Sequence, residues 1–138
     1  MKLQAFIDGA SRGNPGASGI GIVIMNIKGT ILHTSCASLG TTTNNVAEYI
    51  ALRECLRNSK KLNCSLLTIH SDSELLIRHL NGTYKVKAPH LKKLYIDIKS
   101  IITKLPFPVA FKHINREKNR HADRLANQGI ENGHLIAV

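Results

Sequence analysis

Short apolar runs separated by small polar breaks dominate the first forty residues, a pattern typical of β-strands. The stretch "KLQAFID" (2–8) has a largely apolar face. Two further runs, 19–29 and 30–40, meet at a tight turn near Gly29 and predict a β-hairpin. We expect the glycine-rich stretch after Asp8 to be a loop, which places Asp8 at the tip of the first strand.

From Thr43 onward the apolar residues take up helical spacing. Val46, Ile50 and Leu56 fall on one stripe of an amphipathic helix, and a Thr or Asn directly before the stripe is a typical helix cap. The later pattern predicts a strand, two helices, another strand and a final helix. Their ranges are 65–71, 72–82, 89–105, 108–114 and 119–130.

Three strands in succession, followed by strands that alternate with helices, indicate an α/β fold with a mixed sheet and helices on its faces. With 138 residues and no linker or repeat, the chain is expected to form one domain over 1–138. The apolar residues within 129–138 are expected to cover a sheet edge. No apolar run approaches the roughly 20 residues of a membrane span, so no membrane association is expected.

The charge of the chain narrows the choice of partner. Nineteen Lys and Arg against nine Asp and Glu give a net charge of +10. Such an excess favours a polyanionic partner, with nucleic acid ahead of a membrane surface. An ordinary solvated basic surface is the alternative. Three cysteines without metal-binding spacing are expected to be reduced thiols in a cytoplasmic protein.

Four acids fall where strands end or helices begin. Asp8 and Asp72 follow the first and fourth predicted strands, and Glu48 and Asp123 lie early in two helices, beside the apolar stripe. Ligands of open α/β sheets bind outside the carboxyl ends of the strands, where these acids would meet. The alternative is four unrelated acids, some of them placed by the helix dipole.

Clustered carboxylates repel one another and take up protons unless a cation neutralises them. Mg²⁺ prefers oxygen ligands and binds through a few carboxylates together with waters and substrate phosphates. Two such ions, roughly 3.5–4 Å apart, hold the attacking and leaving oxygens of a phosphoryl displacement. A basic chain with an acidic pit is therefore expected to bind two Mg²⁺ ions and to hydrolyse phosphodiesters.

Four motifs occur in order over nearly the whole chain: "DGASRGNPGASGIG", "TTTNNVAEYIAL", "IHSDSELLIRHLNG" and "REKNRHADRLAN". Together they resemble the ribonuclease H family of type 1, which cuts the RNA strand of RNA–DNA hybrids. The resemblance implies a five-stranded mixed sheet with helices on both faces. It also implies a catalytic, metal-binding quartet, with Mn²⁺ as a possible substitute for Mg²⁺. The matching acids are Asp8, Glu48, Asp72 and Asp123.

The same resemblance assigns contacts to the nucleic acid. Family members grip the RNA strand through groups after the first acid and just before the second. These match Gly9, Ser11, Asn14, Asn44 and Asn45. Ribose 2′-hydroxyls both donate and accept hydrogen bonds, so amides and backbone groups suit them. Thr43 matches a phosphate contact on the DNA strand. Helix capping is the alternative for Thr43, Asn44 and Asn45.

The chain departs from the better-known bacterial members of the family in one segment. Those members carry an extra basic helix with tryptophans, whereas "NGTYKVKAP" (81–89) fills this space and the chain has no Trp. The chain therefore resembles a compact subgroup without the basic protrusion. Lys85 and Lys87 are expected to supply part of the hybrid contacts, and a solvated basic face is the alternative.

The loop before the last acid holds two further candidates. Some family members place a mobile histidine there, and His113 has the matching separation from Asp123. His113 lies in a predicted strand, so we expect packing near the core ahead of a role in turnover. Arg116 is a candidate for contacting the scissile phosphate.

These observations lead to one expectation and two alternatives. We expect a monomeric, metal-dependent endonuclease that cuts the RNA strand of RNA–DNA hybrids and leaves 5′-phosphate and 3′-hydroxyl ends. One alternative is a nuclease that also cuts double-stranded RNA. The other is a non-catalytic module that binds RNA or hybrid.

Overall fold

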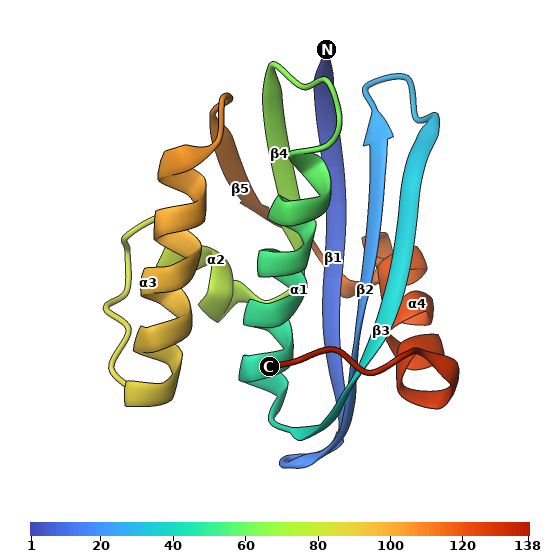
Figure 1. The fold of residues 1–138 in the computed structure, drawn as a ribbon, viewed down its shortest axis with the longest axis vertical. Helices are drawn as coiled ribbons and strands as arrows, with labels where there is room; N and C mark the ends of the chain where they lie inside the picture. Colours follow the sequence, from blue (N-terminus) through green and yellow to red (C-terminus); the bar gives the residue numbers. More distant parts are fainter.

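The computed structural model describes residues 1–138, which form a five-stranded sheet of order β3-β2-β1-β4-β5 (Figure 1). The strands are β1 (Lys2–Gly13), β2 (Gly16–Asn26), β3 (Ile31–Thr42), β4 (Leu66–Ser71) and β5 (Val109–His113). β1, β2 and β3 pair antiparallel, whereas β1, β4 and β5 run parallel. The expected mixed sheet, with a hairpin followed by parallel strands, is confirmed.

Helices cover both faces of the sheet (Figure 1). They are α1 (Asn44–Ser59), α2 (Glu74–Leu80), α3 (Pro89–Lys104) and α4 (Arg120–Asn132), with a short 3₁₀ turn η1 (Arg116–Lys118). α1 and α3 pack together on one face, and α4 lies on the other face behind β1, β2 and β3. None of these helices combines the length and apolar character needed to cross a bilayer.

Local chemistry sets the helix starts. The Oγ1 of Thr43 accepts a hydrogen bond from Val46 N at 3.3 Å, which satisfies one of the free N–H groups of the first turn of α1. Ser73 caps α2 in the same way through Leu76 N at 3.2 Å. Pro89 opens α3, where its missing N–H costs nothing. The capping alternative for Thr43 is thus confirmed.

The glycine-rich stretch after Asp8 is a strand hairpin, so the expectation of a loop was wrong. β1 continues to Gly13 and β2 begins at Gly16. Small residues here have a packing role, because helices lie directly on the backbone. A Cβ on Gly9 would lie 2.6 Å from Ala47 O of α1, and one on Gly19 would lie 2.6 Å from Ala126 O of α4.

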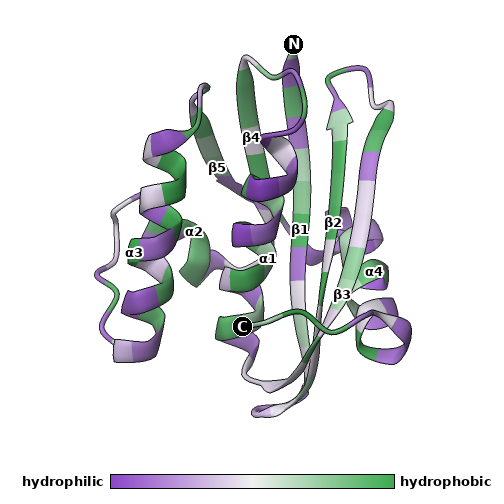
Figure 2. Cartoon of the chain, in the orientation of Figure 1, coloured by the Kyte–Doolittle hydropathy of each residue, from purple (hydrophilic) through white to green (hydrophobic).

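The main core lies between the sheet and the α1–α3 face. Because Gly9 faces α1, the alternate positions Leu3, Ala5 and Ile7 face it too, and all three are fully buried. Ile98 of α3 is fully buried within the same cluster. Figure 2 shows apolar segments along the strands and polar ones on the outer side of α3. Apolar burial of this kind stabilises the fold by about 25 cal/mol per Å².

The last residues cover the outer edge of β3, as expected. Ser38 N donates to His134 O at 2.9 Å, and Ile136 N donates to Ser38 O at 3.0 Å. These bonds form a parallel bridge between Ser38 and Leu135. Edge strands expose free backbone groups that favour pairing with another chain, and the bridge occupies some of them.

Candidate active site

The acids meet at the place where β4 stops while β1 continues. The parallel pairing of these strands ends at Phe6 and His70, and β4 itself ends at Ser71. Beyond this point β4 no longer pairs with β1. Asp8 is in this part of β1, and Asp72 directly follows β4. Asp8 therefore lies within a long strand and not at a strand tip, which corrects the expectation from the sequence.

Three of the four predicted acids form one group. Single carboxylate oxygens of Asp8, Glu48 and Asp72 all lie within 4.8 Å of one another. Glu48 reaches the group from the first turns of α1, and its Oε2 accepts a hydrogen bond from Gly9 N at 3.2 Å. The exposed fractions of Asp8 and Glu48 are only 5% and 9%. The structure thus brings together acids from three distant segments of the chain.

Asp123 lines the same cleft from the first turn of α4. Its Oδ1 lies 3.9 Å from Arg116 Nη2. The cleft has a volume of about 590 Å³ and a mostly polar lining. Its lining residues are Asp8, Gly9, Ala10, Ser11, Arg12, Asn44, Glu48, Asp72, His113, Ile114, Asn115, Arg116, Asp123 and Asn127.

Burial makes two of these carboxyls unusually basic. Burial raises the pKa of Asp8 to about 8, and the negative charges of Asp72 and Asp123 add to this effect. Burial also raises the pKa of Glu48 well above its usual range, helped by Asp8 and Asp72 and opposed by the Gly9 N–H. A hard divalent cation would offset this cost, and an all-oxygen donor set is the set that Mg²⁺ prefers. The residues present therefore fit a divalent cation.

The metal-free protein is expected to lose stability as the pH rises from about 4, where an unfolded Asp titrates, to about 8. Over this range folded Asp8 keeps a proton that the unfolded chain has released, so rising pH favours unfolding. Thermal melts in EDTA measure this effect against Asp8→Asn. The variant should equal the wild type near pH 4 and melt higher, by roughly 5 °C or more, at pH 8. Parallel pH profiles for the two proteins would contradict the assignment.

The two candidates before α4 both lie on the rim of the cleft. His113 ends β5 and is exposed, so the expectation that it packs near the core was wrong. The reason is topological, because β5 is an edge strand and His113 is its last residue. Arg116 is 82% exposed and makes only its distant contact with Asp123. Both side chains thus face solvent beside the acids.

The residues predicted to contact RNA separate into two sets. Gly9, Ser11 and Asn44 line the cleft. Asn14 and Asn45 do not line it, but Asn14 Oδ1 accepts a hydrogen bond from Asn44 N at 3.0 Å. Asn14 therefore fixes the position at which α1 begins.

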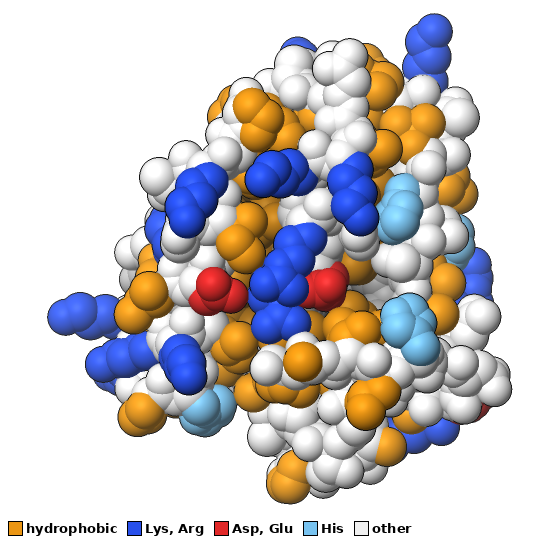
Figure 3. Space-filling view, in the orientation of Figure 1, with side chains coloured by type: hydrophobic (Ala, Val, Ile, Leu, Met, Phe, Trp, Pro, Cys, Tyr) orange, Lys and Arg blue, Asp and Glu red, His pale blue; other side chains and the backbone are white.

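The predicted lysines lie outside the cleft. Lys85 and Lys87 are exposed in the connection between α2 and α3. Lys85 lines a separate hollow of about 530 Å³ together with Tyr84 and Tyr95. On the face that carries α1 and α3, Lys and Arg side chains outnumber Asp and Glu (Figure 3). Basic surface thus extends well beyond the acids.

Sequence reasoning missed Asn119 and Arg12. Asn119 is almost fully buried, and its Nδ2 lies 3.5 Å from Asp72 Oδ2. Arg12 lines the cleft and pairs with Glu131 at 2.7 Å. An Asn directly before a helix is usually a cap, so the local pattern hid the contact of Asn119 with the acids.

Known proteins resemble the chain in sequence and in structure. The sequence model of the family described as reverse transcriptase-like matches residues 6–129. LC11-RNase H1, isolated from compost and solved in complex with an RNA/DNA hybrid, is 44% identical with a TM-score of 0.89, over 94% of this chain and 97% of that one. RNase H1 of Halobacterium salinarum is 30% identical with a TM-score of 0.90, over 96% of this chain and 100% of that one.

A curated relative is much longer than this chain. The bifunctional protein Rv2228c of Mycobacterium tuberculosis is 36% identical over 132 residues, which are 95% of this chain but 36% of that protein. The chain thus spans about a third of the length of the first curated relatives it matches. The two solved structures, in contrast, match over nearly their full length. Together with the family match, this similarity shows that the chain belongs to the ribonuclease H family of type 1.

Proposed function

We propose that the chain is a divalent-metal-dependent endonuclease that hydrolyses the RNA strand of RNA–DNA hybrids and leaves 5′-phosphate and 3′-hydroxyl ends. The observation that carries this proposal is the group of three carboxylates in a cleft, two of them buried, on a chain of net charge +10. Membership of the family and the hybrid bound by LC11-RNase H1 support this choice of substrate.

Two Mg²⁺ ions are the proposed cofactor, with Mn²⁺ as a substitute. Asp8, Glu48, Asp72 and Asp123 would hold them. Glu48 and Asp123 come from helices on opposite faces of the sheet, and each would complete one of the two sites, with Asp8 and Asp72 contributing to both. When bound, the ions would activate the attacking water and stabilise the charge on the leaving 3′-oxygen.

The chain's own residues position the RNA strand. Asn44 and Ser11 line the cleft beside the acids, where hydroxyl and amide groups recognise ribose 2′-hydroxyls. Gly9 presents its backbone there without a side chain. Asn45 is exposed in the same helical turn as Asn44 and would extend this contact. We assign Thr43 a phosphate contact in addition to its cap, since its hydroxyl also donates.

The two residues on the rim of the cleft, Arg116 and His113, would bind the scissile phosphate and transfer a proton, respectively. Arg116 carries a permanent positive charge beside Asp123, and its exposed guanidinium would bind the scissile phosphate through paired N–H donors. His113 lines the cleft from the end of β5 and would exchange a proton with the leaving group or with the product.

Hybrid affinity is expected to depend steeply on salt, because lysine contacts with phosphates release counterions. For the Asp8→Asn variant, which is expected to bind the hybrid without cutting it, affinity should fall at least about tenfold between roughly 50 and 200 mM salt. Replacing Lys85 and Lys87 by alanine should make the slope of log affinity against log salt concentration shallower by about 2, one for each lost phosphate contact. Fluorescence anisotropy with a labelled hybrid measures both effects.

The matched control changes Lys60 and Lys61 to alanine. These exposed lysines follow the last turn of α1, at the opposite end of that helix from Glu48. Their loss should leave the slope unchanged. An affinity that does not respond to salt would refute the role of the basic surface.

The function itself is tested by incubating end-labelled RNA with Mg²⁺, Mn²⁺ or EDTA, as a hybrid, as an RNA duplex and as a single strand. We expect metal-dependent cuts within the hybrid, with 5′-phosphate and 3′-hydroxyl ends. Binding without cleavage in both metals would refute the enzyme and favour a binding module. Equal cleavage of the RNA duplex would show a broader substrate range.

A further inference from the structure

Asn119, the residue before α4, joins three parts of the fold. Only 1% of its surface is exposed, and its side chain does not cap the helix. Instead, Nδ2 donates to Ile7 O at 2.8 Å and lies 3.5 Å from Asp72 Oδ2. Because both partners are oxygen atoms, only the NH₂ end of the amide can face them. One side chain therefore links α4 to β1 and to the segment after β4.

Each of these links leads to a different acid of the cleft. Ile7 directly precedes Asp8 in β1. Asp72 Oδ2 accepts the hydrogen bond from the side-chain amide of Asn119. The backbone oxygen of Asn119 accepts a hydrogen bond from Asp123 N at 3.1 Å, and this bond belongs to the first turn of α4. The position of Asn119 thus sets the relative placement of three acids that come from three separate segments.

The other end of the Asn119 amide, its Oδ1 atom, indicates that this arrangement does not serve stability alone. The Oδ1 of Asn119 is buried without a hydrogen-bond partner, which is a destabilising state for a polar atom. Asparagine at this position usually places that oxygen on the free N–H groups of the helix, and here it does not. The amide is therefore oriented by Ile7 and Asp72 and not by its own helix.

The chemistry of the amide suits a carboxylate that must also bind a cation. An amide donates a hydrogen bond to Asp72 without adding a positive charge. A lysine or arginine at the same place would neutralise the carboxylate and compete with a metal ion. Groups that orient metal ligands in this way typically change metal affinity or activity by about 10–100-fold when they are removed.

We propose that Asn119 is a positioning residue that orients the Asp72 carboxylate relative to Asp8 for binding of the divalent cation, an inference that rests on the proposed function. Asn119 does not line the cleft, so it does not touch the substrate. Its loss should therefore lower kcat and weaken metal binding while leaving the KM for the hybrid within about twofold, since substrate contacts stay in place.

The test uses Asn119→Leu, which keeps the branched shape, although it is larger, and removes the donor, and Asn119→Ser, whose shorter hydroxyl cannot serve both partners. Mn²⁺ affinity is measured on the free protein by electron paramagnetic resonance, without nucleic acid. Both variants should raise the Kd by about tenfold or more. Where Asn119→Leu does not fold, Asn119→Ser carries the same prediction. Folded variants that lose stability but keep the wild-type Kd would overturn the proposal.

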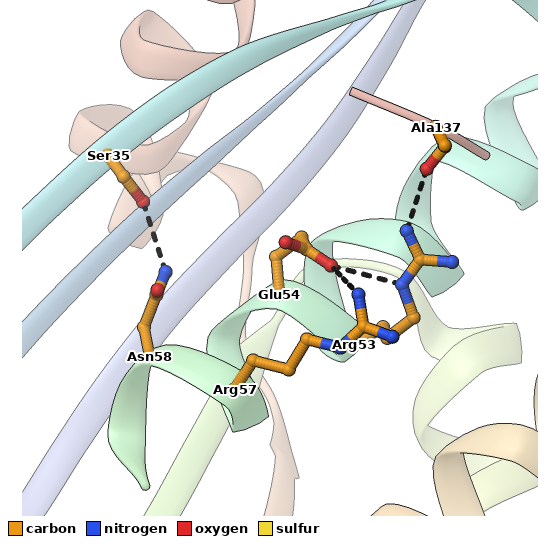
Figure 4. A network of polar contacts seen from close by, with 6 residues as sticks. All are labelled: Ser35, Arg53, Glu54, Arg57, Asn58 and Ala137. Atoms are coloured by element: carbon orange, nitrogen blue, oxygen red, sulfur yellow. Dashed lines mark hydrogen bonds and ion pairs between the residues drawn. The ribbon is translucent and has the colours of Figure 1, made fainter. Parts of the chain in front are cut away.

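Asn58 provides the matched control. It also links a helix to a strand, since its Nδ2 donates to Ser35 Oγ of β3 at 3.5 Å (Figure 4). Asn58 lies ten residues beyond Glu48 in α1, roughly 15 Å along the helix. Asn58→Leu should leave the Mn²⁺ Kd unchanged. A wild type that cuts no hybrid would refute the proposed function, whereas a cutting wild type with unchanged Asn119 variants would refute this inference alone.

Discussion

Replacing Asp8 by asparagine is expected to abolish cleavage of an RNA–DNA hybrid. Asp8 belongs to the group of three acids, and asparagine keeps its shape while removing the charge that a divalent cation needs. The rate should fall by on the order of a thousandfold or more, because in the proposed mechanism bound metal would both activate the water and stabilise the leaving oxygen. Single-turnover cleavage of a labelled hybrid measures the loss.

Hybrid binding by the same variant should persist. In the proposed binding mode, affinity depends on basic side chains and on the residues that line the cleft, so it should stay within about threefold of the wild type in EDTA. Asp97→Asn is the matched control, because it removes an equal charge from the exposed side of α3. This control should cleave at the wild-type rate. Folded Asp8→Asn protein that still cuts at the wild-type rate would remove Asp8 from the reaction.

Gly21→Ala is expected to be strongly destabilising, although it adds only one methyl group to the sheet. A Cβ at this position would lie 2.6 Å from Ala126 N and 2.7 Å from Leu125 Cβ of α4. Most of the contacted atoms belong to the helix backbone, so α4 has to shift outward and lose packing against the sheet, and the cost should reach about 3 kcal/mol. A loss of this size lowers the melting temperature by roughly 10 °C in a chain of this length.

Activity of Gly21→Ala should fall even below its melting temperature, because pushing α4 outward moves Asp123 away from Asp8. Thermal melts and cleavage rates at 20 °C separate the two effects. Ala17→Val is the control, since it enlarges an exposed residue of the same strand. Its melting temperature should stay within about 2 °C of the wild type, in the range of ordinary surface changes. A Gly21→Ala protein as stable as this control would refute the close packing of α4.

The convergence of Asp8 and Asp72 could be predicted from the sequence, because each follows a short apolar run and such runs in parallel strands end at the same edge of a sheet. The length of β1 could not. Glycine and serine disfavour strands on their own, and only the helices lying against Gly9 and Gly19 explain why small residues stay in the sheet. Local propensity was overruled by packing between distant segments.

The surroundings of the acids were less predictable than the acids themselves. The sequence around His113 predicts a strand but does not show whether that strand is central or at an edge. Only the strand order, which places β5 at an edge, explains the exposure of His113. Asn119 precedes a helix and therefore has the pattern of an ordinary cap. Its partners Ile7 and Asp72 lie far away in the sequence, so the contact becomes visible only in three dimensions.

The short connection between α2 and α3 is a site at which the fold can accept an inserted segment. Residues 81–85 are exposed and none of them lines the cleft, while Val86 anchors the far end of the connection in the core. Exposed segments of this kind tolerate insertions because no buried backbone is disturbed. A foreign nucleic-acid-binding segment inserted between Gly82 and Lys85 would therefore enlarge the surface that contacts nucleic acid, while the geometry of the acids stays unchanged.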